Sequence, residues 1–386
     1  MRHRLASLGF AVFICAAASA RAQGTVEPIG TLEGDYRRHS HEFEGRDGFV
    51  IRRARAGLRF RPSERFDLRL VAELARATPG ILDAFGAVRL IEGFELNVGY
   101  FRNPNMLTGR DERAWMTPVP ERAMITAALW PNRDLGFEVH WFPRRWPVEV
   151  WARAGNGVSN PLGPEDSTPT AVLRVDGAFG RLHAWGSRGQ RLGLRVGAAV
   201  MRGDAPERPG PAGVTEMGFQ FFRPVTIVGA RLTMTGHLRA VAGPVQLTVE
   251  GGWERDARAR DTDDNPLTPR DPVGAIDTYG AMGELSWMLT GHHRVSGEWP
   301  WSPRQDRPYG AIELAARFER SWFAQGADDV PGGGVAAAAG ALRWWPNRWS
   351  GLALAVYLHR FDRAPLEAPA QTSGWNAVLR AVVRVP

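Results

Sequence analysis

The sequence predicts an all-β protein, a transmembrane antiparallel β-barrel of about 16 strands, within a range of about 14 to 18. Three observations support this fold class. Hydrophobic residues alternate with polar ones over most of the chain, an export signal precedes them, and no later stretch reaches the roughly 18 apolar residues of a spanning helix. With 44% hydrophobic residues among 386, the composition is also too apolar for a disordered chain.

Residues 1–22 are predicted to be a secretory signal peptide. Basic residues at its start precede an apolar core at 8–17, which is too short to span a membrane. The small-residue pattern Ala20-Arg21-Ala22 then marks a cleavage site, so residues 23–386 are expected to form the barrel domain. The one cysteine, Cys15, lies in the signal, and an exported chain without it forms no disulfide.

The first strands are predicted from a period of two in the side chains. Between Val50 and Arg61 the even positions are apolar except for Arg52, whereas the odd positions are mostly arginine. A turn at 62–65 and a second alternating run at 66–74 complete a hairpin. Further alternating runs follow at 82–90, 94–100, 135–141, 192–200, 228–240, 245–253, 279–289, 312–318, 352–358 and 375–385. Extended to the whole chain, this pattern gives about 16 segments of about 23 residues each, including the connections.

The number of strands and the position of the aromatic residues favour a membrane barrel over the alternative, a secreted soluble β-domain. About 16 long strands exceed what one sandwich usually holds, and a β-structure in hydrocarbon must close on itself. Outward faces would then contact lipid, in the outer membrane of a Gram-negative bacterium. Aromatic residues near strand ends are expected to form an interfacial girdle: Tyr100, Phe101, Trp141, Phe142, Trp299, Trp301, Trp344, Trp345 and Trp349.

One connection lacks alternation over about 30 residues, from Asn103 to Arg133, and a loop this long is usually functional. In a barrel of this width it can fold inward and narrow the lumen. We expect a constriction formed by Arg110, Arg113, Arg122 and Arg133. Other long connections, rich in Pro, Gly and Asp, are predicted to be external: 155–170, 203–214, 255–273, 325–334 and 362–373.

Six short segments, in order between residues 49 and 157, resemble the phosphate-selective porin O and P family of outer-membrane porins. They are the strand from Phe49 to Leu58, Asp83-Ala84-Phe85, the run from Leu96 to Pro104, the Pro118–Arg122 region with Arg133-Asp134-Leu135-Gly136, and Ala154-Gly155-Asn156-Gly157. The resemblance implies a 16-stranded barrel, commonly a homotrimer, with an inward-folded third loop and a lumen that passes small anions such as phosphate. Two features depart from the family: this chain has no lysine, and it ends in Pro386 instead of an aromatic residue.

Charge on the inward faces indicates the solutes. The polar side of each strand places a set of arginines in the lumen: Arg53, Arg55, Arg59, Arg69, Arg89, Arg174, Arg195, Arg231, Arg239, Arg317 and Arg380. Arginine keeps its charge at any relevant pH and favours anions in a pore. Acidic residues point the same way and can pair with it across strands: Asp67, Glu73, Asp83, Glu95, Glu138, Asp176, Glu250, Glu284 and Glu313.

The leading hypothesis is therefore a porin for passive diffusion of small hydrophilic solutes, with outer-membrane lipid and small anions as its partners. It needs no cofactor, metal, nucleic acid or enzymatic activity. The alternative is a barrel closed by its own loops with a structural or enzymatic role. Weaker clusters are interpreted as solvated segments or turns: His39 and His41 with Glu42 and Glu44, the pair His292 and His293, and the possible calcium ligands Asp261, Asp263, Asp264 and Asn265.

Overall fold

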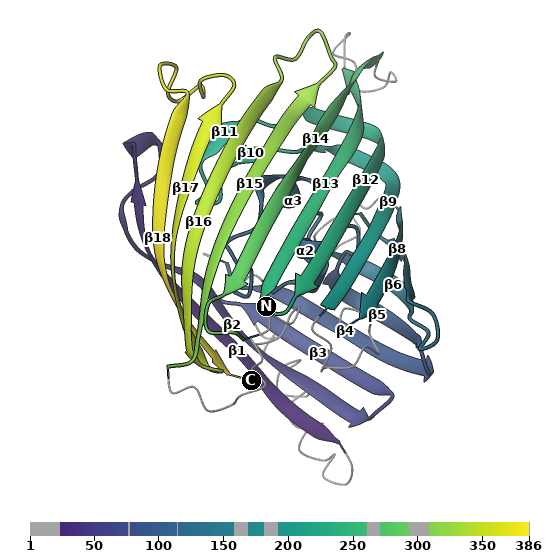
Figure 1. The fold of residues 1–386 in the computed structure, drawn as a ribbon. Helices are drawn as coiled ribbons and strands as arrows, with labels where there is room; N and C mark the ends of the chain where they lie inside the picture. The colour runs from purple at the N-terminus through teal and green to yellow at the C-terminus, as the bar shows by residue number, and fades with distance from the viewer. Residues whose placement is uncertain are drawn as a thin grey trace, which may run out of the picture.

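The computed structural model describes residues 24–75, 78–113, 115–157, 169–180, 192–260, 271–292 and 309–385. Within these residues, sixteen antiparallel strands form one closed barrel, in which β1 pairs with β2 on one side and with β18 on the other (Figure 1). The predicted fold class is confirmed. Closure leaves no unpaired strand edge, as a β-structure in lipid requires.

The barrel strands follow one another in chain order, and a short hairpin interrupts them between β9 and β12. The first half of the wall is β1 (Thr25–His39), β2 (Gly48–Ser63), β3 (Phe66–Glu73), β4 (Gly80–Ile91), β5 (Phe94–Arg102), β6 (Arg133–Trp141), β7 (Val148–Gly155) and β8 (Thr170–Gly180). The second half is β9 (Leu192–Pro209), β12 (Thr226–Ala242), β13 (Val245–Arg260), β14 (Asp271–Met288), β15 (Ala311–Gln325), β16 (Gly333–Asn347), β17 (Ser350–Phe361) and β18 (Ser373–Val385). The remaining elements are η1 (Glu42–Glu44), α2 (Leu107–Asp111), α3 (Met124–Leu129), β10 (Gly213–Val214) and β11 (Gln220–Phe222).

Burial is inverted relative to a soluble protein. Leu354 and Leu358 of β17 point outward and leave about half of their surface exposed, at 50% and 56%. In the next strand Arg380 points into the barrel and is only 1% exposed. Apolar side chains on the outside and charged ones inside are typical of a barrel whose wall contacts lipid. This arrangement fits the outer membrane of a Gram-negative bacterium.

The two ends of the barrel differ. Short turns join β2 to β3, β4 to β5, β12 to β13 and β16 to β17 at one end, which we call the turn end (Figure 1). The strand β1 begins at this end, and β18 ends there. The opposite end, here called the loop end, carries the connection between β5 and β6 and the one between β9 and β12. Among the described residues, no helix is long and apolar enough to cross a membrane.

Several predicted boundaries were wrong. The strands β9 and β13 continue to Pro209 and Arg260, so the first residues of the predicted loops 203–214 and 255–273 are paired in the wall. Hydrogen bonds to the neighbouring strands hold these residues in the wall, although their Pro and Gly content is typical of a loop. The alternation of side chains does not predict the strand β1, because Pro28, Gly30 and Gly34 interrupt the apolar and polar pattern there.

The predicted aromatic girdle is only partly present. Trp141 and Trp344 are exposed on the outer surface at strand ends. Phe101 and Trp345 instead point into the lumen, where the guanidinium of Arg153 lies 4.1 Å from the Phe101 ring and that of Arg343 lies 4.3 Å from the Trp345 ring. Position near a turn therefore did not distinguish the two faces of the wall.

A β-bulge in β2 corrects the predicted orientation of Arg52. Glu33 of β1 pairs with Arg53, but the next residue, Gly34, pairs with Ile51, so one residue of β2 is extra. Arg52 and Arg53 both reach the lumen, whereas Ile51, predicted on the polar face, is 60% exposed outside. Strict alternation cannot reveal such an insertion.

The predicted signal peptide at 1–22 lies outside the described residues, as do Trp299, Trp301 and His293. The candidate calcium ligands Asp261, Asp263, Asp264 and Asn265 lie outside them as well.

Replacing Leu354, at the middle of the outer face of β17, by arginine tests the lipid-facing assignment. We expect Leu354→Arg to lower the free energy of unfolding in lipid vesicles by about 2–4 kcal/mol, because a charge at the bilayer midplane loses its hydration. Leu354→Met, which keeps an apolar side chain of similar size, is the control. Equal stability of the two variants in urea titrations would contradict the assignment.

Candidate functional site

The connection between β5 and β6, residues 103–132, is called loop L3 here and lies inside the barrel. Met106, Leu107 and Ile125 are completely buried in it. The predicted inward fold of this loop is confirmed. L3 carries the short helices α2 and α3, which contact each other. The helix α3 also contacts the inner faces of β13, β14 and β15.

Glutamates of the barrel wall hold the starts of both L3 helices. Neither helix has a side-chain cap of its own. Glu250 of β13 accepts hydrogen bonds from the backbone N–H groups of Leu107 (2.5 Å) and Thr108 (3.3 Å). Glu319 of β15 accepts one from the N–H of Met124 at 2.6 Å. These carboxylates satisfy donors that would otherwise be unpaired at a helix start.

Arginines on the same side of the wall hold the carbonyl groups of L3. Arg343 of β16 donates to the carbonyls of Trp115 (2.7 Å) and Thr117, and Arg317 of β15 donates to that of Glu121 at 2.9 Å. The Tyr357 hydroxyl donates to the Pro120 carbonyl. L3 is thus fixed against β13–β17 through both its donors and its acceptors.

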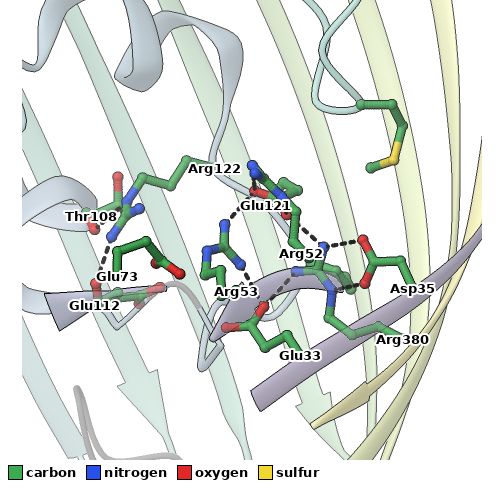
Figure 2. A network of polar contacts seen from close by, with 12 residues as sticks. Glu33, Asp35, Arg52, Arg53, Glu73, Thr108, Glu112, Glu121, Arg122 and Arg380 are labelled. Atoms are coloured by element: carbon green, nitrogen blue, oxygen red, sulfur yellow. Dashed lines mark hydrogen bonds and ion pairs between the residues drawn. The ribbon is translucent and has the colours of Figure 1, made fainter. Parts of the chain in front are cut away.

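The Glu121 side chain ties L3 to the other side of the barrel (Figure 2). It accepts hydrogen bonds from Arg52 (2.8 Å) and Arg53 (2.7 Å) of β2 and from Arg380 (2.5 Å) of β18. Its φ of +83° lies in the left-handed region, which is uncommon for a residue other than glycine. Such strain persists when surrounding contacts over-determine it, and three arginines on one carboxylate provide that constraint.

Two cavities remain open beside β2–β5, one on each side of L3. The loop-end cavity has a volume of about 510 Å³ and is lined by three glutamates and six arginines. The arginines are Arg37, Arg52, Arg53, Arg55, Arg122 and Arg133. The turn-end cavity has a volume of about 540 Å³ and is lined by three acidic residues and seven arginines, Arg59, Arg61, Arg65, Arg69, Arg89, Arg110 and Arg113. Positive charge is therefore in excess on the walls of both.

Some of these arginines have no carboxylate within ion-pair distance among the described residues. Arg122 donates only to the carbonyls of Thr108 (3.4 Å) and Glu112 (2.9 Å). Burial lowers the pKa of Arg122 to about 9, and the positive charges of Arg53 and Arg133 act in the same direction. An anion beside this group would offset that repulsion.

Arg113 is the corresponding L3 residue in the turn-end cavity, where its guanidinium lies 5.9 Å from the Trp115 ring. Burial lowers its pKa to about 10, with the charges of Arg69 and Arg384 adding to the effect. Each cavity thus contains one L3 arginine that the described residues do not pair with an acid. Both stay cationic at neutral pH.

Most of the predicted site residues meet at these cavities. Arg53 and Arg55 line the loop-end cavity, and Arg59, Arg69 and Arg89 line the turn-end cavity. Several are partly neutralised by hydrogen bonds or ion pairs, as the acids of the inward faces suggested: Arg53 with Glu33, Arg55 with Glu73, Arg59 with Asp67, and Arg69 with Asp83.

The remaining predictions divide in the same way. Arg110 and Arg113 face the turn-end cavity, whereas Arg122 and Arg133 face the loop-end one. Two predicted pore-lining residues lie away from both cavities: Arg195 pairs with Asp111 of L3 at 2.9 Å, and Arg231 pairs with Asp256 at 2.7 Å. The inward-facing set predicted from alternation along the strands does not include four arginines that reach the cavities from a bulge, a strand end or a turn: Arg37, Arg52, Arg61 and Arg65.

A second connection also enters the lumen, against the prediction that 203–214 is external. Residues 210–225, called loop L5 here, contain β10 and β11, and Glu216 and Phe219 are buried in them. Glu216 accepts a hydrogen bond from Arg317 at 2.9 Å and lies 2.7 Å from His359. The Gly and Pro content of this segment suggested an external loop. Composition alone does not indicate that Glu216 is buried in the lumen.

The weaker clusters form no metal site in the described part of the chain, where no group of three or more His, Cys, Asp or Glu is arranged to hold an ion. The His39 ring nitrogen lies 3.4 Å from Asp47, and that of His292 lies 2.7 Å from the Thr290 hydroxyl.

The chain matches no family model and no curated protein in sequence. The resemblance to phosphate-selective porins thus gains no support from a family match. The fold of this chain is similar to those of solved outer-membrane barrels. Examples are a loop L8 deletion mutant of OmpT of Vibrio cholerae (11% identity, 94% of this chain and 99% of that one, TM-score 0.58), the channel DcaP of Acinetobacter baumannii (11%, 94% and 98%, 0.57) and OpdL of Pseudomonas aeruginosa (11%, 94% and 98%, 0.50).

Glu121→Gln tests the attachment of L3. We expect it to lower the free energy of unfolding by about 3 kcal/mol or more, since losing one partner of a buried ion pair leaves the other charge uncompensated. Amide hydrogen exchange in L3 should also become faster. Glu64→Gln, in the exposed turn between β2 and β3, is the control; unchanged exchange in Glu121→Gln would show that L3 is held by its other contacts alone.

Proposed function

We propose that this barrel is an outer-membrane porin for passive diffusion of small hydrophilic solutes, with a preference for anions. The passage runs between L3 and the wall formed by β2–β5. The observation that carries the proposal is the pair of arginine-rich cavities on opposite sides of L3, each with an L3 arginine that forms no ion pair among the described residues. One protein of similar fold, DcaP, is described as an outer membrane channel, which supports the channel part of the proposal.

The proposed mechanism is electrostatic and needs neither an energy source nor a cofactor. A solute in the passage loses part of its hydration shell, and guanidinium N–H groups replace those contacts for carboxylate or phosphate oxygens. A cation meets the same groups as a repulsive barrier. Because Arg122 and Arg113 lie on opposite sides of L3, an anion finds a positive group before and after the narrowest region.

Three finer points belong to the same proposal. Phosphate is included among the solutes because its oxygens suit the arginine donors, but the same chemistry admits small carboxylates. A homotrimer is proposed from the resemblance to the porin family. No residue is assigned a catalytic role.

Reversal potentials in planar bilayers under a salt gradient test the charge preference. We expect the wild-type protein to favour the anion. Arg113→Gln and Arg122→Gln should each lower the anion-to-cation permeability ratio by about fivefold or more, since one charge about 4 Å from an ion in water contributes about 1 kcal/mol, with opposite sign for the anion and the cation. Arg348→Gln, in the turn between β16 and β17, is a control outside both cavities and should leave the ratio unchanged.

A reversal potential that favours the cation would overturn the anion preference while leaving a channel. A barrel that is folded but passes no current would overturn the channel itself. That second result would favour the alternative, a barrel closed by its own loops.

A further inference from the structure

Loop L5 rests on a part of the wall that has unusually small inward side chains. The inner face of β16 presents Val335, Ala337 and Ala341, and β17 adds Ala355. Met217 of L5 fills the space beside Ala341 and Ala355, and its aromatic residues fill the space beside Val335 and Ala337. These small residues form a seat for L5 on β16 and β17, which β18 and β1 separate from β2 in the barrel.

L5 is held less firmly than L3. Many backbone donors and acceptors of L3 bond to the wall, and Glu121 adds three arginines. Within the described part of the chain, the buried ion pairs between L5 and the wall involve one carboxylate, Glu216, which contacts Arg317 and His359. Arg37 reaches the Met217 carbonyl at 3.3 Å, and the Arg223–Glu367 pair at 2.9 Å is exposed, where ion pairs contribute little.

The base of L5 is closed, because the Gly210 N–H donates to the Val225 carbonyl at 2.9 Å. Pro211 and Pro224 flank this bond on the loop side, and Gly218 near the tip has a φ of +102°. Residues 211–224 take no part in the pairing of the wall strands, so a displacement of L5 about this base breaks no hydrogen bond between wall strands.

The first strand of L5, β10, separates two compartments. Val214 of L5 and Met124 and Ala127 of α3 line both the loop-end cavity and a third cavity of about 370 Å³. The residues that separate the two are apolar on both sides. Because these side chains make only apolar contacts with each other, L5 can separate from α3 without breaking a hydrogen bond between them.

We infer that L5 is a flap that sets the size limit of the pore. Seated through Glu216, it divides the loop-end part of the lumen and leaves only the loop-end cavity beside L3 for passage. Unseated, it joins the two compartments and admits larger solutes. This inference rests on the proposed porin function. It makes Glu216, which also lines the loop-end cavity, a residue that determines specificity by holding L5 in its seat.

Glu216→Gln tests the seat. Arg317 keeps Glu319 at 3.5 Å and Glu284 at 3.8 Å, so the variant does not strand an unpaired charge and should fold. Adding a 370 Å³ compartment to one of 510 Å³ enlarges it about 1.7-fold, and we expect a rise of that order in single-channel conductance. Liposome swelling should show passage of neutral oligosaccharides that the wild-type protein excludes. Glu92→Gln, which removes an exposed ion pair at the turn end, is the control.

An introduced disulfide can hold L5 in its seated position and can be reduced to release it. A Cβ built on Gly333 lies 3.4 Å from that of Phe222, close to the spacing of a disulfide, and the only native cysteine is in the predicted signal peptide. In the Glu216→Gln background, Phe222→Cys with Gly333→Cys should restore wild-type conductance and size exclusion when oxidised. Reduction should release the flap again, and Phe222→Cys alone should not respond.

The outcomes separate the two proposals. If Glu216→Gln conducts and excludes sugars as the wild-type protein does, L5 is a fixed part of the wall and the inference is wrong. If the increase persists when the disulfide is oxidised, the change does not come from L5 movement and the inference is also wrong. A wild-type barrel that passes neither ions nor sugars would instead overturn the porin function on which the inference rests.

Discussion

The need to pair every backbone N–H and C=O group in hydrocarbon determines the rest of this structure. Sixteen strands meet it by closing into a barrel, and closure turns one face of each strand to lipid and the other to the lumen. Apolar residues such as Leu354 occupy the first face and charged residues such as Arg380 the second. A bore of this width is not filled by wall side chains alone, so loops occupy part of it.

The same pairing rule applies to the loops inside the lumen. Because L3 lies away from bulk water, its backbone groups take partners from the wall: Glu250 and Glu319 for N–H groups, Arg317 and Arg343 for carbonyls. Charges on the β13–β17 side are therefore used to hold the loop. On the β2–β5 side arginines outnumber acids around both cavities, and this unequal distribution produces the proposed preference for anions.

The sequence was sufficient for the fold class and for much of the site. A period of two separates Arg53 and Arg55 from their apolar neighbours, and the length of the 103–133 segment identified the loop that enters the bore. What it could not show depends on contacts distant along the chain. The bulge at Arg52 appears only when β1 sets the register, and the burial of L5 depends on small residues of β16 more than a hundred positions later. Composition is similar for external and internal loops, because both need turns.

A continuous path past L3 is the central claim, and thiol labelling of one introduced cysteine tests it most directly. Ala127 of α3 is exposed to the loop-end cavity and carries no charge, so Ala127→Cys in the mature chain adds a lone reactive group without altering the arginines. If the path is continuous, a small negatively charged thiol reagent reduces the current when added at either side of a bilayer. Labelling from one side only, with none from the other, would mean that L3 closes the barrel and would contradict the account.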